Sequence, residues 1–292
     1  MTAIRQKRNP AGATSINRLT AGPVLAGHLQ FEAARREDGR TALARQSFRA
    51  PFHISKPYWD GRVLQVQVVN STAGILAGDR LELAVEVMAG AALRVTTPAA
   101  TRAFMMRSGA AECRQSFSVA AGAWLEYSPE PLCPHRACDY AQTTRLALAA
   151  DAEVFFADAL APGRVGRGEA WAWRRLLLQL DIEVGGEPIL RERLDCSGAD
   201  LARLAAFYSS SAAWFATVVI FSPRLTVDDP AWPALRASHG GDRWVGVTRL
   251  RRAGWIVRLI APGGQALRDL LAQVRSTLAK KLPSLQGDPR KL

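Results

Sequence analysis

The sequence has no apolar run long enough to cross a membrane as a helix, which would need about 20 largely apolar residues. Its N-terminus carries Arg5, Lys7 and Arg8 with no apolar stretch behind them, so we expect no secretory signal peptide. Cysteine is scarce, with four in 292 residues: Cys113, Cys133, Cys138 and Cys196. We therefore expect a cytoplasmic protein with reduced thiols and no membrane partner.

Signs of catalysis are also missing. The four histidines stand apart, and none forms a His-x-x-x-His or His-Glu-x-x-His pair. No serine lies in a nucleophile-elbow context, and no Gly-Lys-Ser/Thr phosphate loop is present. Four carboxylates lie near predicted turns, where acidic residues are favoured for structural reasons alone: Asp79, Glu130, Asp158 and Glu169. We expect the chain not to be an enzyme, and a β-rich hydrolase is the alternative.

Acidic residues are fewer than basic ones: the chain has 26 Asp and Glu and 38 Lys and Arg, which gives a formal net charge of +12. Such an excess favours acidic partners. The basic residues are spread along the chain, however, and no block of them is interleaved with aromatic residues. This pattern favours a diffuse surface charge and no nucleic-acid partner. A basic protein that binds nucleic acid or an anionic surface is a further alternative.

Alternation of apolar and polar residues is abundant. It covers residues 63–69, 81–87 and, in the longest run, 171–184. Small-residue turns such as Ala89-Gly90, Ala121-Gly122 and Gly185-Gly186 separate the alternating segments. Many short period-two segments without intervening helices predict a mostly β fold, a sandwich, barrel or coil, and argue against a Rossmann-like sheet.

Helical spacing occurs in two places. Residues 200–208 show it, and near the C-terminus five apolar residues fall on one helix face: Leu267, Leu270, Leu271, Val274 and Leu278. Gly263-Gly264 before this second segment and Pro283 after it are helix start and stop signals. We expect a flexible N-terminal arm over residues 1–20 and a single β domain over 21–292 that includes the C-terminal helix.

Three turn segments carry the distinctive residues. The segment 70–80 joins two alternating runs, so we expect Gly74 or Gly78 to have positive φ or to lie against another backbone. The segment 160–171 is a tight basic loop with Gly163, Arg164 and Glu169. The segment 129–140 places Cys133, His135 and Cys138 within six residues. A closed zinc site needs a fourth ligand, so we expect no tight structural zinc there.

These segments together resemble the UreD (UreH) urease accessory protein family. The matching stretches are 70–81, 96–102, 129–131, and 161–164 with Gly168-Glu169. One Gly-x-x-x-Gly-Asp would be weak evidence, but four stretches in the family's order are specific. The resemblance covers about residues 25–194, with weaker support from the C-terminal helix.

The resemblance implies a mostly β fold, a β-helix-like coil of stacked sheets with about two α-helices. It also implies a scaffold without enzymatic activity that binds the urease apoprotein and helps deliver nickel to the urease active site. The implied partners include accessory proteins of the UreF and UreG type, the latter a GTPase. Nickel would be bound only transiently, with no tightly bound cofactor.

The resemblance also suggests which residues bind partners or line a nickel conduit. They are Gly74, Gly78, Asp79, Glu130, Pro131, Gly163, Arg164 and Glu169. A conduit needs ligands that release their ion, so oxygen and imidazole groups suit it. On chemistry alone the metal candidates are Asp79, Glu130, His135 and Glu169. Cys133 and Cys138 are unusual for the family and receive no role from it.

Overall fold

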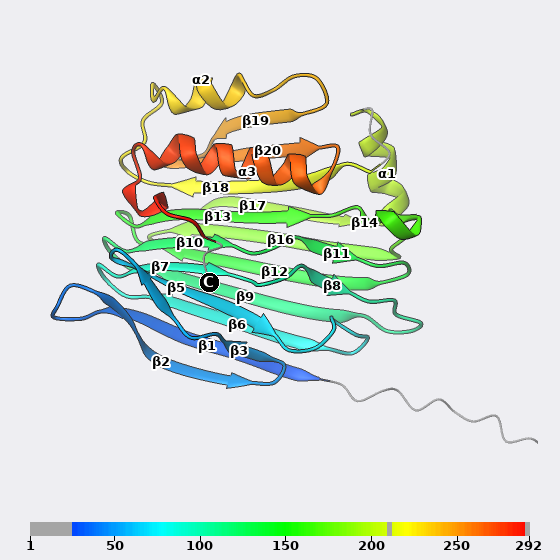
Figure 1. Ribbon diagram of the computed structural model, residues 1–292, viewed down its shortest axis with the longest axis horizontal. Coiled ribbons are helices and arrows are strands. Elements are labelled where there is room, and N and C mark those ends of the chain that lie inside the picture. Colours follow the sequence, from blue (N-terminus) through cyan, green and yellow to red (C-terminus); the bar gives the residue numbers. More distant parts are fainter. Residues whose placement is uncertain (1–24, 209–211, 290–292) are drawn as a thin grey trace, which may run out of the picture.

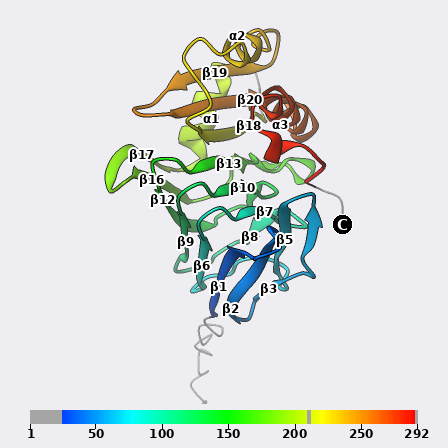
Figure 2. The ribbon, with the colours of Figure 1, turned by 90° about the vertical axis from the view of Figure 1, so that its left-hand side faces the viewer.

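The computed structural model describes residues 25–208 and 212–289 (Figure 1). The predicted flexible arm, residues 1–20, lies outside the described residues. Most of the described chain is β-strand, arranged in two large sheets that face each other (Figure 2). The expected mostly β, coil-like fold is confirmed.

The first sheet contains seven strands, and its order follows the stacking of the coil. From one edge to the other these are β17 (Glu187–Cys196), β16 (Arg175–Val184), β12 (Asp139–Leu148), β9 (Ala111–Val119), β6 (Arg80–Val87), β1 (Ala26–Arg35) and β2 (Thr41–Arg49). The five strands from β16 to β1 are parallel, and the edge strands β17 and β2 are antiparallel to their neighbours.

The second sheet faces the first and is extended by later parts of the chain. Its main path runs β19 (Trp244–Arg249), β20 (Gly254–Ala261), β18 (Trp214–Phe221), β13 (Glu153–Leu160), β10 (Trp124–Ser128), β7 (Ala92–Thr96), β5 (Val63–Asn70) and β3 (Phe52–Ile54). Short strands join it off this path: β4 (Tyr58–Asp60), β8 (Thr101–Ala103) and β11 (Leu132–Pro134). The chain alternates between the two sheets from β5 to β16, and each pair of strands forms one coil.

Every coil has a tight turn at one end and a longer loop at the other. The tight turns stack on one another, as where Gly90 N donates to Ala121 O at 3.1 Å and Glu153 N donates to Ala123 O at 2.9 Å. We call this side the turn end. The opposite side, the loop end, consists of residues 71–79, 97–110, 129–138 and 161–174 (right-hand side of Figure 1). All three turn segments singled out in the sequence therefore lie at the loop end.

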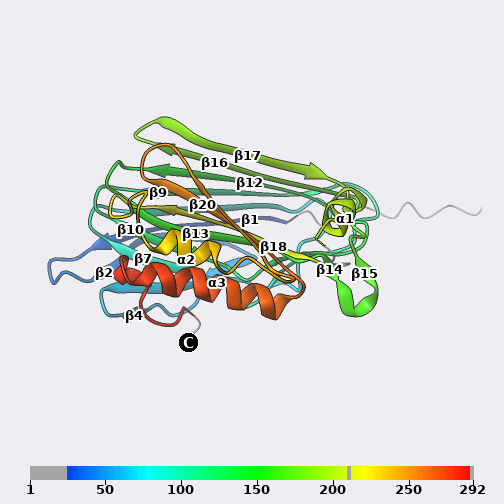
Figure 3. The ribbon, with the colours of Figure 1, turned by 90° about the horizontal axis from the view of Figure 1, so that it is seen from above.

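Two apolar cores hold the coil together. Between the sheets, aromatic rings pack against one another, with Phe117 4.7 Å from Tyr127 and 5.4 Å from Phe156 between ring centroids. The outer face of the second sheet is covered by α2 (Ala231–Arg236) and α3 (Gly264–Ala279) (Figure 3). There, Trp232 of α2 stacks on Trp255 at 4.0 Å. Burying each large apolar side chain contributes about 1.5–3 kcal/mol.

The helices differ slightly from expectation. The predicted C-terminal helix is α3, with Leu267, Leu270, Val274 and Leu278 buried. The segment predicted at residues 200–208 is α1 (Gly198–Ala206), which begins at the capping box of Ser197 and Asp200. The described residues contain a third α-helix, α2, which was missed because six residues are too few to show a helical period. No helix among the described residues is long and apolar enough to cross a membrane.

The longest predicted strand begins later than its alternation suggested. Residues 171–174 form part of a loop, and β16 starts at Arg175. Trp171 has φ of 59°, which ends extended pairing at that residue, and its N–H donates to Pro162 O at 2.7 Å. Two short paired strands, β14 (Gly163–Arg164) and β15 (Glu169–Ala170), flank the 3₁₀ turn η1 (Val165–Arg167) in this loop.

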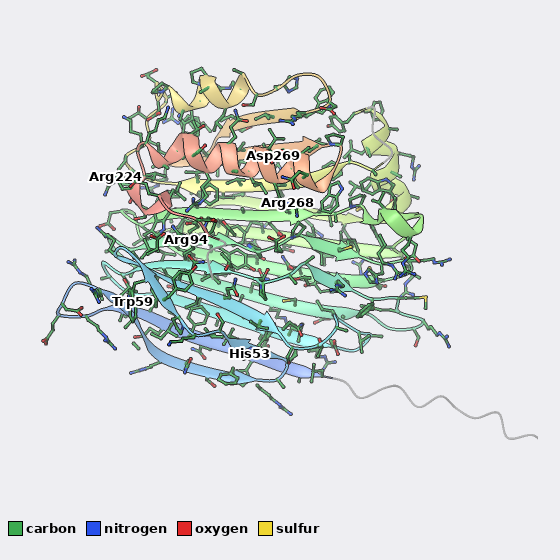
Figure 4. The ribbon with its side chains drawn as sticks, viewed as in Figure 1. His53, Trp59, Arg94, Arg224, Arg268 and Asp269 are labelled. Carbon is green, nitrogen blue, oxygen red and sulfur yellow. The ribbon has the colours of Figure 1, made fainter. Side chains whose placement is uncertain are left out.

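A buried ion network fastens the C-terminal segment to the second sheet. Arg94 of β7 is fully buried and donates through Nε to Glu126 of β10 at 2.6 Å (Figure 4). Its Nη2 donates to Ser284 O and Gln286 O, which lie in and just beyond the 3₁₀ turn η2 (Pro283–Leu285). Arg275 of α3 also donates to Glu126, at 2.7 Å. Every charge in the network thus has an opposite partner, which buried charges require.

Candidate functional site

The loops at the loop end are stacked in register like the coils that bear them. Ile75 bridges to Ala103 in the next loop, where β8 pairs with β11 of the following loop. β11 in turn meets β13 through Leu132 and Leu160. Backbone hydrogen bonds thus connect the loops, and the loop end is an extension of the sheets.

Two glycines permit this close stacking. A Cβ atom on Gly74 would lie 2.5 Å from Arg102 O and 2.7 Å from the Phe104 ring. A Cβ atom on Gly163 would lie 2.5 Å from Glu169 O. The expectation for the first turn is confirmed, since Gly74 meets another backbone and Gly78 has φ of 88°.

We expect Gly74→Ala to lower the free energy of unfolding by about 1–3 kcal/mol, because the added methyl overlaps a backbone carbonyl that cannot move freely. Gly166→Ala is the matched control, since no atom lies within 4 Å of the place its methyl group would occupy and its φ is not positive. Urea denaturation of both variants measures the difference. Equal stabilities would show that the first loop can shift without cost.

Asp79 and Glu130 take part in the loop backbone. Asp79 is buried and accepts a hydrogen bond from Leu76 N at 2.8 Å, closing its own turn. The backbone N–H of Glu130 donates to Thr97 Oγ1 at 2.9 Å. Pro131 O accepts from Thr101 N at 3.1 Å. These residues shape the stacked loops, and their side chains come from different turns.

Glu169, Arg164 and His135 do come together. The guanidinium of Arg164 contacts both carboxylate oxygens of Glu169 at 2.7–2.9 Å, and this pairing holds the pKa of Glu169 below its usual range. Arg136 adds a longer contact at 3.4 Å. His135 is buried against the Phe104 ring, and burial, with Arg164 second, lowers its pKa. The imidazole is therefore neutral near pH 7, while Glu169 is neutralised by arginine.

The four metal candidates from the sequence do not form one cluster. Within the part of the chain that the structure describes, no three His, Cys, Asp or Glu side chains are grouped so that they could hold a metal ion. Cys138 is buried and Cys133 half-buried, and burial raises the pKa of both thiols, that of Cys138 to about 12. Any role of these residues in metal transfer stays a prediction.

Polar side chains continue from the loop end into the space between the sheets. A cavity of about 140 Å³ is bounded by the first two loops, including Thr72, Gly74 and Thr101, and by inward-facing residues of β9 and β12. Among these, Tyr140 donates to Gln142 at 3.1 Å. Polar side chains thus line part of a largely apolar interior, where buried polar groups cost free energy unless they are paired.

A second cavity of about 110 Å³ adjoins the first, and Gln142 lines both. Asp158 of β13 and Glu192 of β17 line this second cavity from opposite sheets. Gln142 donates to Asp158 at 3.2 Å. Removal from water, with a smaller contribution from Glu192, raises the pKa of Asp158 from the ordinary 3.8 to about 6.

Glu192 lies at the outer side of this cavity, where the edge strand β17 faces β18. Arg258 of β20 donates to its Oε1 at 2.6 Å. Its other oxygen, Oε2, is buried and has no hydrogen-bond partner among the described residues. An unpaired buried carboxylate oxygen is costly, so this atom is well suited to meet a cation.

The side-chain oxygens that line this cavity are of the kind that hard and borderline cations accept. They include two carboxylates and the hydroxyl of Thr217, with no thiolate or imidazole, whereas the amide oxygen of Gln142 accepts from Tyr140. Cys113, the nearest thiol, is buried with its pKa raised to about 11, so it is protonated at neutral pH. We call Asp158, Glu192 and Gln142 the interior site.

Sequence reasoning missed the interior site. It placed Asp158 near a turn, whereas Asp158 lies within β13 and pairs with Thr217 of β18. Glu192 received no attention. The available signal was polar residues at inward positions of an alternating strand, as at Gln142 and Thr144 of β12, which are buried.

Comparison with known proteins agrees with the fold and the loop motifs. The sequence model of the UreD urease accessory protein family matches residues 25–291. The chain belongs to the UreD family. It is 52% identical over 270 residues to the urease accessory protein UreD of Opitutus terrae, covering 92% of this chain and 99% of that protein.

More distant UreD proteins also match nearly end to end. The UreD of Herpetosiphon aurantiacus is 31% identical over 256 residues, which is 87% of this chain and 88% of that protein. The UreD of Alkalilimnicola ehrlichii is 27% identical across all of this chain and 99% of its own. The resemblance first noted in four short loop segments thus extends over the whole described body, including β18–β20 and α3.

Proposed function

We propose that this chain is a urease maturation scaffold that guides Ni²⁺ through its interior to the urease active site. It binds the urease apoprotein and accessory proteins of the UreF and UreG type, acts in the cytoplasm, and has no catalytic turnover. The observation that carries the proposal is the interior site. Asp158 and Glu192 line, from opposite sheets, a cavity whose other walls are mostly apolar, in a protein of the UreD family.

The polar side chains that line the two cavities support passage rather than storage. The cavity at the loop end and the cavity of the interior site share Gln142, so an ion can be handed between oxygen ligands at both ends. A few oxygen ligands bind the ion weakly enough for it to leave again, which a conduit requires. Nickel is therefore a cargo, and no cofactor stays tightly bound.

The raised pKa of Asp158 supports the same function. Asp158 holds a proton more readily than an exposed carboxylate, chiefly because burial disfavours its charged form and to a smaller extent because Glu192 lies near. A divalent cation between the two carboxylates would replace that proton. The free energy of binding is then the attraction between cation and carboxylates minus the cost of removing the cation's hydration water and the proton. This difference is small, which keeps the affinity low.

Deleting the gene for this chain tests the proposal. The deletion strain should still synthesise urease apoprotein, but that apoprotein should contain little nickel at ordinary nickel concentrations. Nickel per urease protomer, measured by mass spectrometry on purified urease, is the readout, and re-expression of the chain should restore it. Fully loaded urease in the deletion strain would reject a role in nickel delivery.

A further inference from the structure

Exposed apolar side chains gather at the loop end. The described residues include nine large apolar side chains that are well exposed, and five of them lie on the stacked loops, on α1 or at its C-cap: Leu76, Met105, Val165, Leu204 and Phe207. The first three come from three different loops. α1 joins the same surface because Gly198 lies against the backbone of Trp171 in the fourth loop (Figure 1).

The charged residues around these side chains are almost all arginines. The four loops carry six arginines, of which five are exposed: Arg102, Arg107, Arg136, Arg167 and Arg174. They carry three acidic residues, and two of these, Asp79 and Glu169, are buried. The tight turns of the opposite end, residues 88–91, 120–123, 149–152 and 185–186, contain a single charged residue, Asp151.

An apolar surface bordered by arginines has the composition of a protein interface. Aromatic residues, Met and Arg are enriched where proteins dock, and a charged rim steers a partner of opposite charge. Four loops stacked about 4.8 Å apart, with α1 beyond them, present these side chains at one end of the coil. The same positive charge disfavours a second copy of this chain.

We propose that the loop end is the docking surface for the urease apoprotein, an inference that rests on the proposed function. A partner that receives Ni²⁺ from the interior site would dock where the cavity meets the surface, and an acidic docking face would be complementary in charge. The loop end supplies the complementary arginines. It also bounds the cavity that leads to the interior site, through Gly74, Thr101 and Arg102.

Single substitutions at this surface test the proposal with the full-length protein. Met105→Glu and Arg107→Glu should each weaken binding to purified urease apoprotein about tenfold, because each places a carboxylate against an acidic face. Met105 is 52% exposed, so the substitution leaves the core unchanged. Matched controls lie at the turn end: Met88→Glu, at 41% exposure, and Arg62→Glu, both expected to bind within about twofold of wild type.

The outcomes separate this inference from the proposed function. Biolayer interferometry on immobilised apoprotein, with and without the UreF-type protein, measures each affinity. If wild type does not bind apoprotein under either condition, the proposed function itself is wrong. If wild type binds and both loop-end variants bind equally well, the docking surface is wrongly placed. Loss of binding to the UreF-type protein instead, or self-association that the variants abolish, would also overturn the assignment.

Discussion

Urease activation should fall at least about tenfold when Asp158→Asn and Glu192→Gln are combined in one chain. The double variant keeps the shape of the interior site but removes both negative charges that would attract Ni²⁺. Folding should be preserved, because the neutral Asn no longer has to lose hydration as a charge in the cavity. Urease activity in a deletion strain that expresses the variant, normalised to urease protein, gives the result.

A matched control separates this effect from a general change of charge. Glu82→Gln with Glu112→Gln removes two carboxylates from the exposed outer face of the first sheet. This control should activate urease as well as wild type. Equal loss in both double variants would show that total charge, and not the interior site, matters.

The protonation of Asp158 adds a pH dependence with a definite sign. Its pKa is raised in the folded protein to about 6, so the folded state holds the proton more tightly than the unfolded state does. The resulting contribution to stability is fully present below about pH 4 and is lost as pH rises from about 4 to 6. Cation binding has the opposite dependence because it needs the carboxylate. Nickel affinity at pH 5 should therefore be about tenfold weaker than at pH 7.5.

Replacing Arg94 by Met should lower the free energy of unfolding by about 3–5 kcal/mol. The substitution leaves Glu126 buried with one cation instead of two, and it removes the bonds that hold Ser284 O and Gln286 O. Arg145→Met is the control, because its partner Glu183 forms an exposed ion pair worth less than about 1 kcal/mol. Urea denaturation at pH 7 compares the two variants.

The Arg94 result also bears on the C-terminal segment. Loss of these bonds should release residues 283–289 before the coil unfolds, which limited proteolysis detects as early cleavage there. A stability loss below about 1 kcal/mol in Arg94→Met would mean that the apolar contacts of η2 alone hold the segment in place.

The alternation in the sequence was enough to predict the strands but not how they pair. Residues 63–69 and 81–87 read as strands because their apolar side chains alternate, and they form β5 and β6. A sandwich, a barrel and a coil share this period, so it could not show that β5 and β6 belong to opposite sheets. Only the resemblance to a known family pointed to the coil.

The candidate site shows the same limit more sharply. Gly74 and Gly78 were predictable because a tight turn acts on its own residues. Asp158 and Glu192 meet only because β13 and β17 lie in opposite sheets, and nothing local marks either residue. Arg94 and Glu126 are likewise neighbours only through the parallel register of β7 and β10.

Nickel transfer in a purified system tests the interior site most directly. Urease apoprotein, the UreF- and UreG-type proteins, GTP and Ni²⁺ would be combined with wild-type chain or with the Asp158→Asn, Glu192→Gln variant, and nickel per urease protomer measured after gel filtration. We predict near-stoichiometric nickel with wild type and less than about a tenth of it with the variant, while complex formation is unchanged. Full loading by a variant that still assembles would contradict passage of nickel through the interior site.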